Sequence, residues 1–420
     1  MEKTENTKAT LHRGIGLFDA TAIGLGAIIG GGIFVVTGIA AGLAGPALIV
    51  SMVISAAIAS FTAFSFSKLS MSLPKEGGVY GFAYEYISPF AGFTAGWMWI
   101  FSNVFVGAAV SLGFASYFLA LFPSLSIKAV AIAVCLLFTI LNIIGIRQSA
   151  MLNSILVSTK VLILLFFMAF GLFYINGSNF VPFAPNGPFG ILQGSALIFF
   201  AYAGFARITI LAEEVKGANR TIPRSIFLAL GISTVIYLLT SFVAVGLTGY
   251  VNLSASGSPL AEAIGVTGNR LAVSLISVGA IMATASVLLT TILGVSRVMF
   301  AMARNEDVPK FLCNIHSKFK TPYYAVAVTG SLMILAIIFT DFARIVAVSS
   351  FAVLLYYALA NLAAIRLGRR KNHFSIISLV GLLSCLGLLA FLTVDSWVIG
   401  TTGVAIGVVF YLVWNRIKKQ

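Results

Sequence analysis

The first long apolar stretch of the chain, residues 15–39, contains the segment GLGAIIGGGIF at residues 24–34. Its three consecutive glycines, Gly30, Gly31 and Gly32, stand where a membrane-spanning helix favours leucine or isoleucine. In hydrocarbon every backbone N–H and C=O group needs a partner, so a helix broken at membrane depth is tolerated only where it lines a cavity or a bound ligand. The segment therefore predicts an interrupted span that forms part of a binding site.

The composition places the chain in a membrane. Of its 420 residues, 60% are apolar and 9% are charged, and the mean hydropathy is +1.05; soluble domains usually carry about a quarter charged residues. Stretches long enough to cross a hydrocarbon core of about 30 Å predict twelve spans, at residues 15–41, 46–73, 89–121, 126–146, 150–175, 190–214, 224–249, 270–303, 322–340, 343–366, 374–393 and 396–415. We expect an all-α, multi-pass membrane protein.

The 26 lysines and arginines alternate with the predicted spans. With the N-terminus inside, 21 lie in tails, inside loops or the inside ends of spans, two lie deeper within spans, and three lie on the outside, namely Lys128, Arg270 and Arg344. This distribution follows the positive-inside rule, and it argues against nucleic acid as the reason for the net charge of +14. We expect a cell-membrane protein with both termini in the cytoplasm.

No polar stretch is long enough for a separate soluble domain. We expect a cytoplasmic tail at residues 1–13, without a removable signal peptide, and a single transmembrane domain at residues 14–416. Cys135 and Cys385 fall within spans and Cys313 falls in an inside loop, which favours ordinary packing over a disulfide or a metal cluster. No cofactor and no metal are expected.

A second interruption is predicted five spans after the first, at FFAYAGF, residues 199–205. Two interrupted helices five spans apart indicate an inverted repeat, with units at residues 14–176 and 189–367 and two further spans at residues 374–416. The alternative is that Gly26 and Gly30, a small-xxx-small pair, only pack against a neighbouring helix. The triple glycine and the second interruption favour the binding site.

Two cations fall within the spans, Lys160 and Arg207, and no histidine does. A lysine at mid-membrane costs about 2.5–3.5 kcal/mol on insertion scales. Because burial disfavours the charged form, we expect Lys160 to gain and lose a proton during transport, holding the unwound carbonyls of span one when charged and releasing them when neutral. The alternative is a permanently charged lysine that only ties helices together.

Other charged residues lie near the ends of the two interrupted spans. Arg207 follows the second interruption by one turn, and we expect it to pair with Glu213 or Glu214 rather than to contact substrate. Pairs between these acids and inside-loop cations would form an inner gate, and a solvated acidic turn is an equal alternative. Asp19, where span one begins, is expected to cap its helix and to have no transport role.

Motifs along the chain, in the same order, resemble those of the amino acid, polyamine and organocation (APC) superfamily. They are the first-span segment 24–34, PKEGGVY (74–80) in the first inside loop, FFAYAGF (199–205) in span six, EEV (213–215) with TIPR (221–224) in the loop that follows, and SRVMFAMAR (296–304) at the end of span eight. The resemblance covers about residues 14–325.

This resemblance implies a leucine-transporter-type fold that works by alternating access, with an amino acid held between spans one and six. In such a site the N–H groups of Gly30, Gly31 and Gly32 bind the α-carboxylate. The carbonyls of Ile28, Phe200 and Ala203 then accept hydrogen bonds from the α-ammonium group. The backbone would recognise any amino acid, and neighbouring spans would select the side chain.

The resemblance also implies roles for side chains. Phe200 is expected to cover the substrate as a lid, Lys160 resembles the lysine that replaces sodium in proton-coupled members, and Ser286 is expected near that site. Two residues depart from the family pattern: Gly31, where Ser or Thr is frequent, and Arg207, where many relatives have an acid. An arginine beside the path disfavours cationic substrates.

These features predict a proton-coupled symporter of neutral, small or apolar amino acids, whose partners are an amino acid, protons and the lipid bilayer. The oligomeric state stays open and a monomer is possible. An amino acid exchanger with the same site is the first alternative, and a non-transporting amino acid sensor is the second. An enzyme is not expected, because intramembrane hydrolysis needs paired aspartates, a Ser/His set or histidine metal ligands, and the spans contain no histidine.

Overall fold

A computed structural model of the chain describes residues 15–73, 77–122, 124–145, 150–210, 215–339, 342–371 and 375–418, without the side chains of residues 150–154. The secondary structure of these residues is helical, apart from a single bridge between Ile15 and Val215. The all-α class predicted from the sequence is therefore confirmed.

The first half of the chain forms a series of helices with one early interruption. They are α1 (Leu17–Ile28), a π-helical turn (Gly32–Val36), α2 (Thr37–Ala44), α3 (Leu48–Ser72), α4 (Val79–Tyr86), α5 (Pro89–Leu121), α6 (Ile127–Ile144) and α7 (Ala150–Gly171).

The second half is also helical and carries a second irregular segment. Its elements are α8 (Gly187–Tyr202), a 3₁₀ turn (Ala203–Phe205), α9 (Ala206–Ile210), α10 (Ala218–Ala255), α11 (Pro259–Gly265), α12 (Arg270–Arg304), α13 (Tyr323–Phe339), α14 (Phe342–Arg370), α15 (Ile376–Leu389) and α16 (Val394–Ile417).

Nine helical segments of the described residues are long and apolar enough to cross a membrane. The first of them, Leu17–Ser72, has 56 residues, which at about 1.5 Å per residue is more than twice the length of one crossing. A turn at Gly45–Ala47 divides it, and Gly45 has the positive φ of 64° that favours glycine. α13 and α15 are apolar but shorter. The count of twelve crossings remains a prediction.

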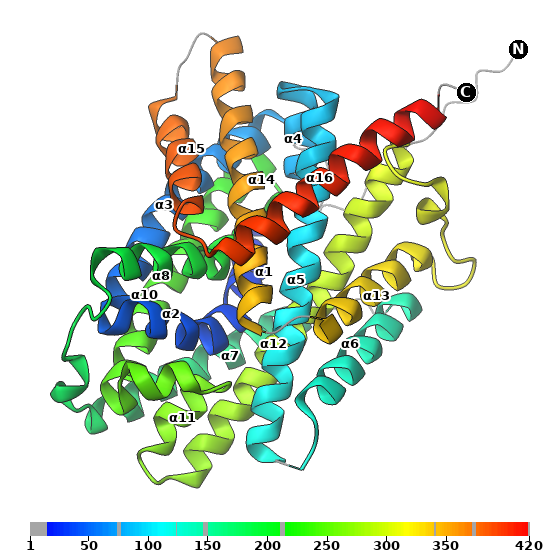
Figure 1. The fold of residues 1–420 in the computed structure, drawn as a ribbon. Helices are drawn as coiled ribbons and strands as arrows, with labels where there is room; N and C mark the ends of the chain where they lie inside the picture. Colours follow the sequence, from blue (N-terminus) through cyan, green and yellow to red (C-terminus); the bar gives the residue numbers. More distant parts are fainter. Residues whose placement is uncertain are drawn as a thin grey trace, which may run out of the picture.

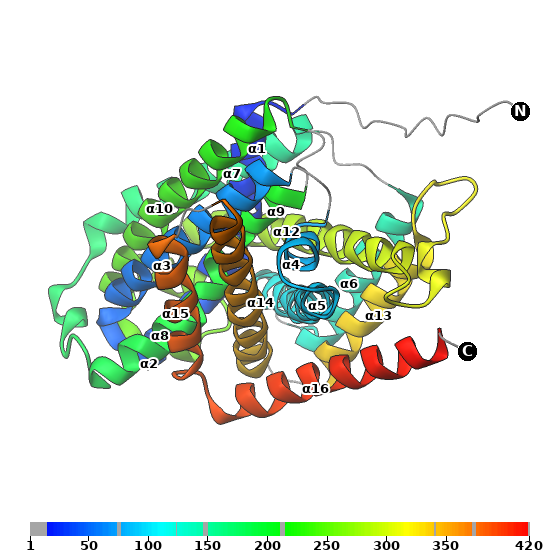
Figure 2. The same cartoon turned by 90° about the horizontal axis from the view of Figure 1, so that it is seen from above.

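The helices form a bundle around α5, which runs through the middle of the molecule and packs against α12 and α14 (Figures 1 and 2). α4 lies at one end of the bundle and α11 at the opposite end, while α16 runs along the outer edge (Figures 1 and 2). α1 packs against α7, α9 and α10. The two irregular segments are therefore enclosed by other helices rather than exposed at the periphery.

Two segments predicted to lie in loops contain helices, namely α4, between the second and third predicted spans, and α11. The sequence predicts a loop at residues 250–269, and the structure places α11 there, with Pro259 in its first turn. Leu260 donates its N–H to the Tyr117 hydroxyl at 3.2 Å, and that hydroxyl donates to the Phe34 carbonyl at 2.5 Å. With seven residues, α11 is too short to be recognised from hydropathy. Its hydrogen bonds to α5, and through Tyr117 to the π-helical turn, fix its position.

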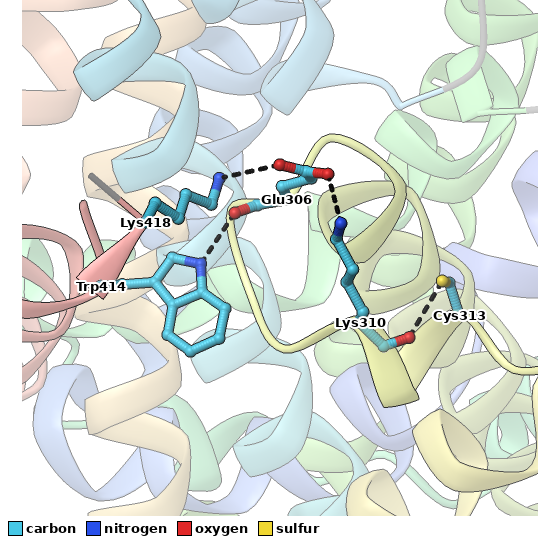
Figure 3. Close-up of polar contacts among 5 residues, drawn as sticks. All are labelled: Glu306, Lys310, Cys313, Trp414 and Lys418. Carbon is cyan, nitrogen blue, oxygen red and sulfur yellow. Dashed lines mark hydrogen bonds and ion pairs between the residues drawn. The ribbon is translucent and has the colours of Figure 1, made fainter. Parts of the chain in front are cut away.

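The C-terminal helix is attached to the loop that follows α12. Trp414 of α16 donates its indole N–H to the Glu306 carbonyl at 2.8 Å, and the Glu306 carboxylate contacts Lys310 at 2.7 Å and Lys418 at 4.0 Å (Figure 3). The hydrogen bond from Lys310 holds the pKa of Glu306 below its ordinary value. Glu306 therefore joins the end of α16 to the helix-bundle end that also carries α4 (Figure 1).

Candidate substrate and proton site

The first interruption lies where the triple glycine predicts it. α1 ends at Ile28, Ile29 is extended with φ −75° and ψ 96°, and helical backbone resumes at Gly31. The next five residues, Gly32–Val36, form a π-helical turn before α2 begins. N–H groups at the start of a helical segment have no acceptor within that helix. The first helix is thus interrupted directly before Gly31, while the leucine-transporter-type inverted repeat and the role of the glycines in binding a carboxylate remain predictions.

Close packing explains why glycines occupy this position. A Cβ atom added to Gly32 would lie 2.5 Å from the Cβ of Ala201 and 2.8 Å from its Cα. A Cβ atom on Gly30 would overlap the side chain of Val287 in α12. The same glycines therefore both interrupt the helix and allow close packing, because the irregular backbone lies directly against α8 and α12.

The second predicted interruption is a short 3₁₀ turn rather than an unwound segment. α8 ends at Tyr202, and Ala203–Phe205 continue as a 3₁₀ turn into α9. Ala203 has φ −62° and ψ −12°, so the chain stays right-handed and helical. A Cβ atom on Gly204 would overlap the backbone of Ala27. This segment has one glycine where the first has three, and its backbone departs less from the α-helix.

Tyrosine hydroxyls occupy two of the carbonyls predicted to receive the substrate ammonium. Tyr237 donates to the Ile28 carbonyl at 2.6 Å, and Tyr357 donates to the Ala203 carbonyl at 2.6 Å. The Phe200 carbonyl accepts the N–H of Ala203. Each carbonyl oxygen has a second lone pair, so binding of the ammonium group remains a prediction.

Sequence reasoning missed these tyrosines, although a signal existed. A phenol in hydrocarbon must find a polar partner, and an interrupted helix supplies unpaired carbonyls. Tyr237 and Tyr357 both fall in the middle of predicted spans. Searching the spans for hydroxyl donors, as well as for charges, would have found them.

Lys160 contacts the first interruption. Its side chain is fully buried in α7, and Nζ lies 3.3 Å from the Gly26 carbonyl and 3.4 Å from the Ile29 carbonyl. Both acceptors belong to the last turn of α1 and the extended residue after it. Ser286 is buried in α12, and the described residues show no hydrogen bond between it and Lys160. Proton coupling through Lys160 remains a prediction.

Arg207 has partners that the sequence did not predict. Its guanidinium donates to the Thr290 hydroxyl at 3.0 Å and to the Thr291 hydroxyl at 2.6 Å, both in α12. Glu213 and Glu214, the expected partners and gate residues, lie outside the described residues. A threonine pair inside an apolar span gave no signal by itself, because threonine usually bonds back to its own helix.

The beginning of α1 is fixed by two contacts. The Asp19 carboxylate accepts the N–H of Gly16 at 3.2 Å, which is the capping contact predicted for it. Lys216, which follows α9, donates its N–H to the Ile15 carbonyl at 2.9 Å. The chain therefore links the start of α1 directly to the segment that follows the second irregular turn.

A cavity of about 40 Å³ lies between the two irregular segments. Its walls include Gly30, Gly31, Gly32, Phe200, Arg207, Trp99, Asn103 and Tyr356. Since about 10–15 Å³ of such space holds one water molecule, this cavity has room for a few water molecules.

The sequence matches known transporters along its whole length. A family model described as amino acid permease matches residues 15–414. An uncharacterized transporter of Mycobacterium tuberculosis is 35% identical, over 98% of this chain and 93% of that protein. The branched-chain amino acid permease BcaP of Bacillus subtilis is 31% identical, over 97% of this chain and 94% of that protein.

Relatives named for other substrates have similar identity. The methylthioribose transporter of Bacillus subtilis is 30% identical, over 98% of this chain and 95% of that protein. The vacuolar cationic amino acid transporter 4 of Arabidopsis thaliana is 31% identical, over 80% of this chain and 60% of that protein. The chain belongs to the amino acid permease family of the APC superfamily, and family membership alone does not define its substrate.

Proposed function

We propose that this permease is a proton-coupled symporter that carries neutral amino acids across the cell membrane by alternating access. The observation that carries the proposal is the contact of the buried Lys160 ammonium group with the Gly26 and Ile29 carbonyls at the end of α1. A titratable group that holds an interrupted helix can couple its protonation to the shape of the site.

The interrupted backbone supports binding of a zwitterion. The N–H groups of Gly30, Gly31 and Gly32 lie at the beginning of a helical segment and border the cavity, where the helix dipole favours a carboxylate. Phe200 is buried and borders the same cavity from α8, which suits its role as a lid. In this proposal the Ile28, Phe200 and Ala203 carbonyls receive the ammonium group through their remaining lone pairs.

Protonation of Lys160 controls the first interruption in this mechanism. When charged, the amine donates strong hydrogen bonds to the Gly26 and Ile29 carbonyls and holds the end of α1. When the proton leaves, those bonds weaken and α1 is free to move relative to α7. Each cycle therefore carries one proton with the amino acid, and Lys160 takes the place that a sodium ion occupies in sodium-driven relatives.

The charge of the cavity supports neutral substrates. Arg207 contributes a fixed positive charge to its wall, which repels a lysine or arginine side chain. BcaP is named for branched-chain, and therefore neutral, amino acids and is similar over nearly its full length. The plant relatives named for cationic amino acids match this chain over only about 60% of their own length.

Reconstitution tests this proposal. Purified protein in empty liposomes should accumulate a neutral amino acid only under an inward proton gradient, and Lys160→Ala should lower this accumulation to the level of protein-free liposomes. Lys128→Ala is the matched control, because Lys128 is exposed and bonds to the Ile338 carbonyl in α13, away from the cavity.

Two results would contradict the proposal. Proton-driven accumulation that survives in Lys160→Ala would exclude the lysine as the coupling group. Uptake that requires internal amino acid and ignores the proton gradient would identify the protein as an exchanger. Thermal stabilisation of Lys160→Ala by the amino acid would show that the variant is folded and binds its substrate.

A further inference from the structure

The wall of the cavity contains an arginine whose hydrogen-bonding capacity is only partly used. Arg207 donates to the hydroxyls of Thr290 and Thr291, whereas a guanidinium has five N–H donors. The described residues place no carboxylate in an ion pair with it. Within the part of the chain that the structure describes, three of its donors have no partner, and Arg207 borders the cavity together with the glycines of the first interruption.

The two threonines fix the direction of this guanidinium. Thr291 donates its own hydroxyl proton to the Val287 carbonyl at 2.6 Å, and Thr290 donates to the carbonyls of Ser286 and Val287 at 3.0 Å. A hydroxyl has only one proton, so both threonines face Arg207 as acceptors. They hold one side of the planar group, and its other donors have no partner among the described residues.

Two further polar side chains border the cavity with Arg207. Tyr356 and Asn103 also border the cavity, and the Asn103 amide nitrogen already donates to the Trp99 carbonyl at 2.9 Å. Asn103 and Tyr356 thus place two further polar side chains in the wall that contains Arg207. A wholly apolar side chain bound against this wall would cover charged donors without giving them an acceptor, which is costly.

We infer that Arg207 is a specificity-determining residue that selects, among neutral amino acids, those whose side chain ends in an oxygen acceptor: serine, threonine, asparagine and glutamine. The inference rests on the proposed function and narrows its substrate class. It departs from the small or apolar side chains expected from sequence alone. A site built to hydrogen-bond a polar group discriminates strongly against an analogue that lacks it.

Isosteric pairs of amino acids test the inference on the purified full-length protein. Threonine and valine have the same shape and differ in one hydroxyl, and asparagine and leucine differ similarly in their terminal groups. Calorimetric titration should give a dissociation constant at least about tenfold lower for threonine than for valine, as expected for one lost hydrogen bond to a charged donor. Asparagine should be preferred over leucine in the same way.

Variants connect this preference to Arg207. Arg207→Met should bring the ratio of the threonine and valine dissociation constants close to one while glycine still binds, and Arg207→Lys should give an intermediate ratio. Arg270→Met is the control, because Arg270 is exposed at the beginning of α12, and it should leave the ratio unchanged. If the Arg207 variants do not fold, equal binding of threonine and valine by the unmodified protein would still overturn the inference.

Each outcome separates this inference from the proposed function. Equal binding of threonine and valine, or a preference that persists in Arg207→Met, would overturn the inference and leave neutral amino acid transport intact. Loss of glycine binding in Arg207→Met would overturn it too, because Arg207 would then bind the α-carboxylate. Aspartate binding more tightly than asparagine would support the acceptor role of the site but overturn the neutral substrate class.

Discussion

At the residue scale, hydroxyl groups satisfy the backbone that the interrupted helix exposes. Tyr237 bonds to the Ile28 carbonyl at 2.6 Å and to the Ala201 carbonyl at 3.3 Å, so one phenol joins the end of α1 to the last turn of α8. Tyr357 and Lys160 serve neighbouring carbonyls in the same way. An interruption at this depth is possible because each of these carbonyls has a side-chain donor.

Removing the Tyr237 hydroxyl should therefore destabilise the protein. We expect Tyr237→Phe to lower the free energy of unfolding by about 1 kcal/mol, the scale of a buried hydrogen bond between membrane helices. The measurement is the thermal midpoint in detergent. Tyr174→Phe is the control, because Tyr174 is exposed and the described residues give its hydroxyl no hydrogen bond. Equal midpoints for the two variants would show that the Tyr237 contact contributes nothing.

At the element scale, the contact between the first interruption and α8 depends on the absence of a side chain. Gly32 lies so close to Ala201 that an added Cβ would be 2.8 Å from the Ala201 backbone, which a side-chain rotation cannot relieve. The helices must separate or one must shift. The glycines are thus a packing requirement as well as the predicted carboxylate site.

A methyl group at this contact should have a large effect. We expect Gly32→Ala to cost about 1–3 kcal/mol, as overpacking of a dense interior usually does, and to reduce amino acid uptake. Gly231→Ala is a precise control, because Gly231 lies in α10 with no heavy atom within 4 Å of the added Cβ. That variant should be as stable as the unmodified protein or more stable. A Gly32→Ala protein with normal stability and uptake would contradict the packing account.

The sequence was sufficient for the elements and insufficient for their contacts. Apolar runs predict the long helices, with ends that differ by up to six residues, and the triple glycine predicts a break next to Ile29. The partners of Lys160 were expected, because mid-membrane cations need carbonyls. The contacts of Thr290, Thr291 and Tyr237 were not expected, since these residue types are common in spans and gain their hydrogen-bond partners only through tertiary packing. For the same reason α11 was predicted as a loop.

At the scale of the whole molecule, one end of the bundle is joined by polar contacts. Tyr80 of α4 donates to the Asp307 carboxylate at 2.7 Å and accepts from the Asn305 amide at 2.6 Å. The adjacent Glu306 holds α16 through Trp414 and Lys418 (Figure 3). Residues 305–307 thus connect α4, α12 and α16 at the end of the molecule opposite α11 (Figure 1).

The Glu306 pair should contribute weakly and with a defined pH dependence. The pKa of Glu306 is lowered and that of Lys310 is raised by their hydrogen bond. Because the pKa of Glu306 is lowered, its carboxylate stabilises the fold at pH values above the ordinary carboxyl pKa of 4.5. This contribution is lost as the pH falls through the lowered pKa. Because the pKa of Lys310 is raised, its ammonium group stabilises the fold at pH values below the ordinary lysine pKa of 10.5. This contribution is lost as the pH rises through the raised pKa.

We therefore expect Glu306→Gln to lower the thermal midpoint slightly at pH 7 and low salt, by less than Gly32→Ala does. The difference from the unmodified protein should shrink in high salt, because both partners are exposed, and at acidic pH. Thermal midpoints across salt and pH measure this. A decrease that is large and insensitive to salt would contradict a surface ion pair.

The central claim is that a proton moves with each amino acid through the site that Lys160 shares with the interrupted α1. The most direct measurement is proton movement driven by the amino acid itself. In proteoliposomes that start with equal pH on both sides, addition of the transported amino acid outside should raise the external pH as protons enter with it, and Lys160→Ala should show no such change. Amino acid entry without any proton movement in the unmodified protein would contradict the account.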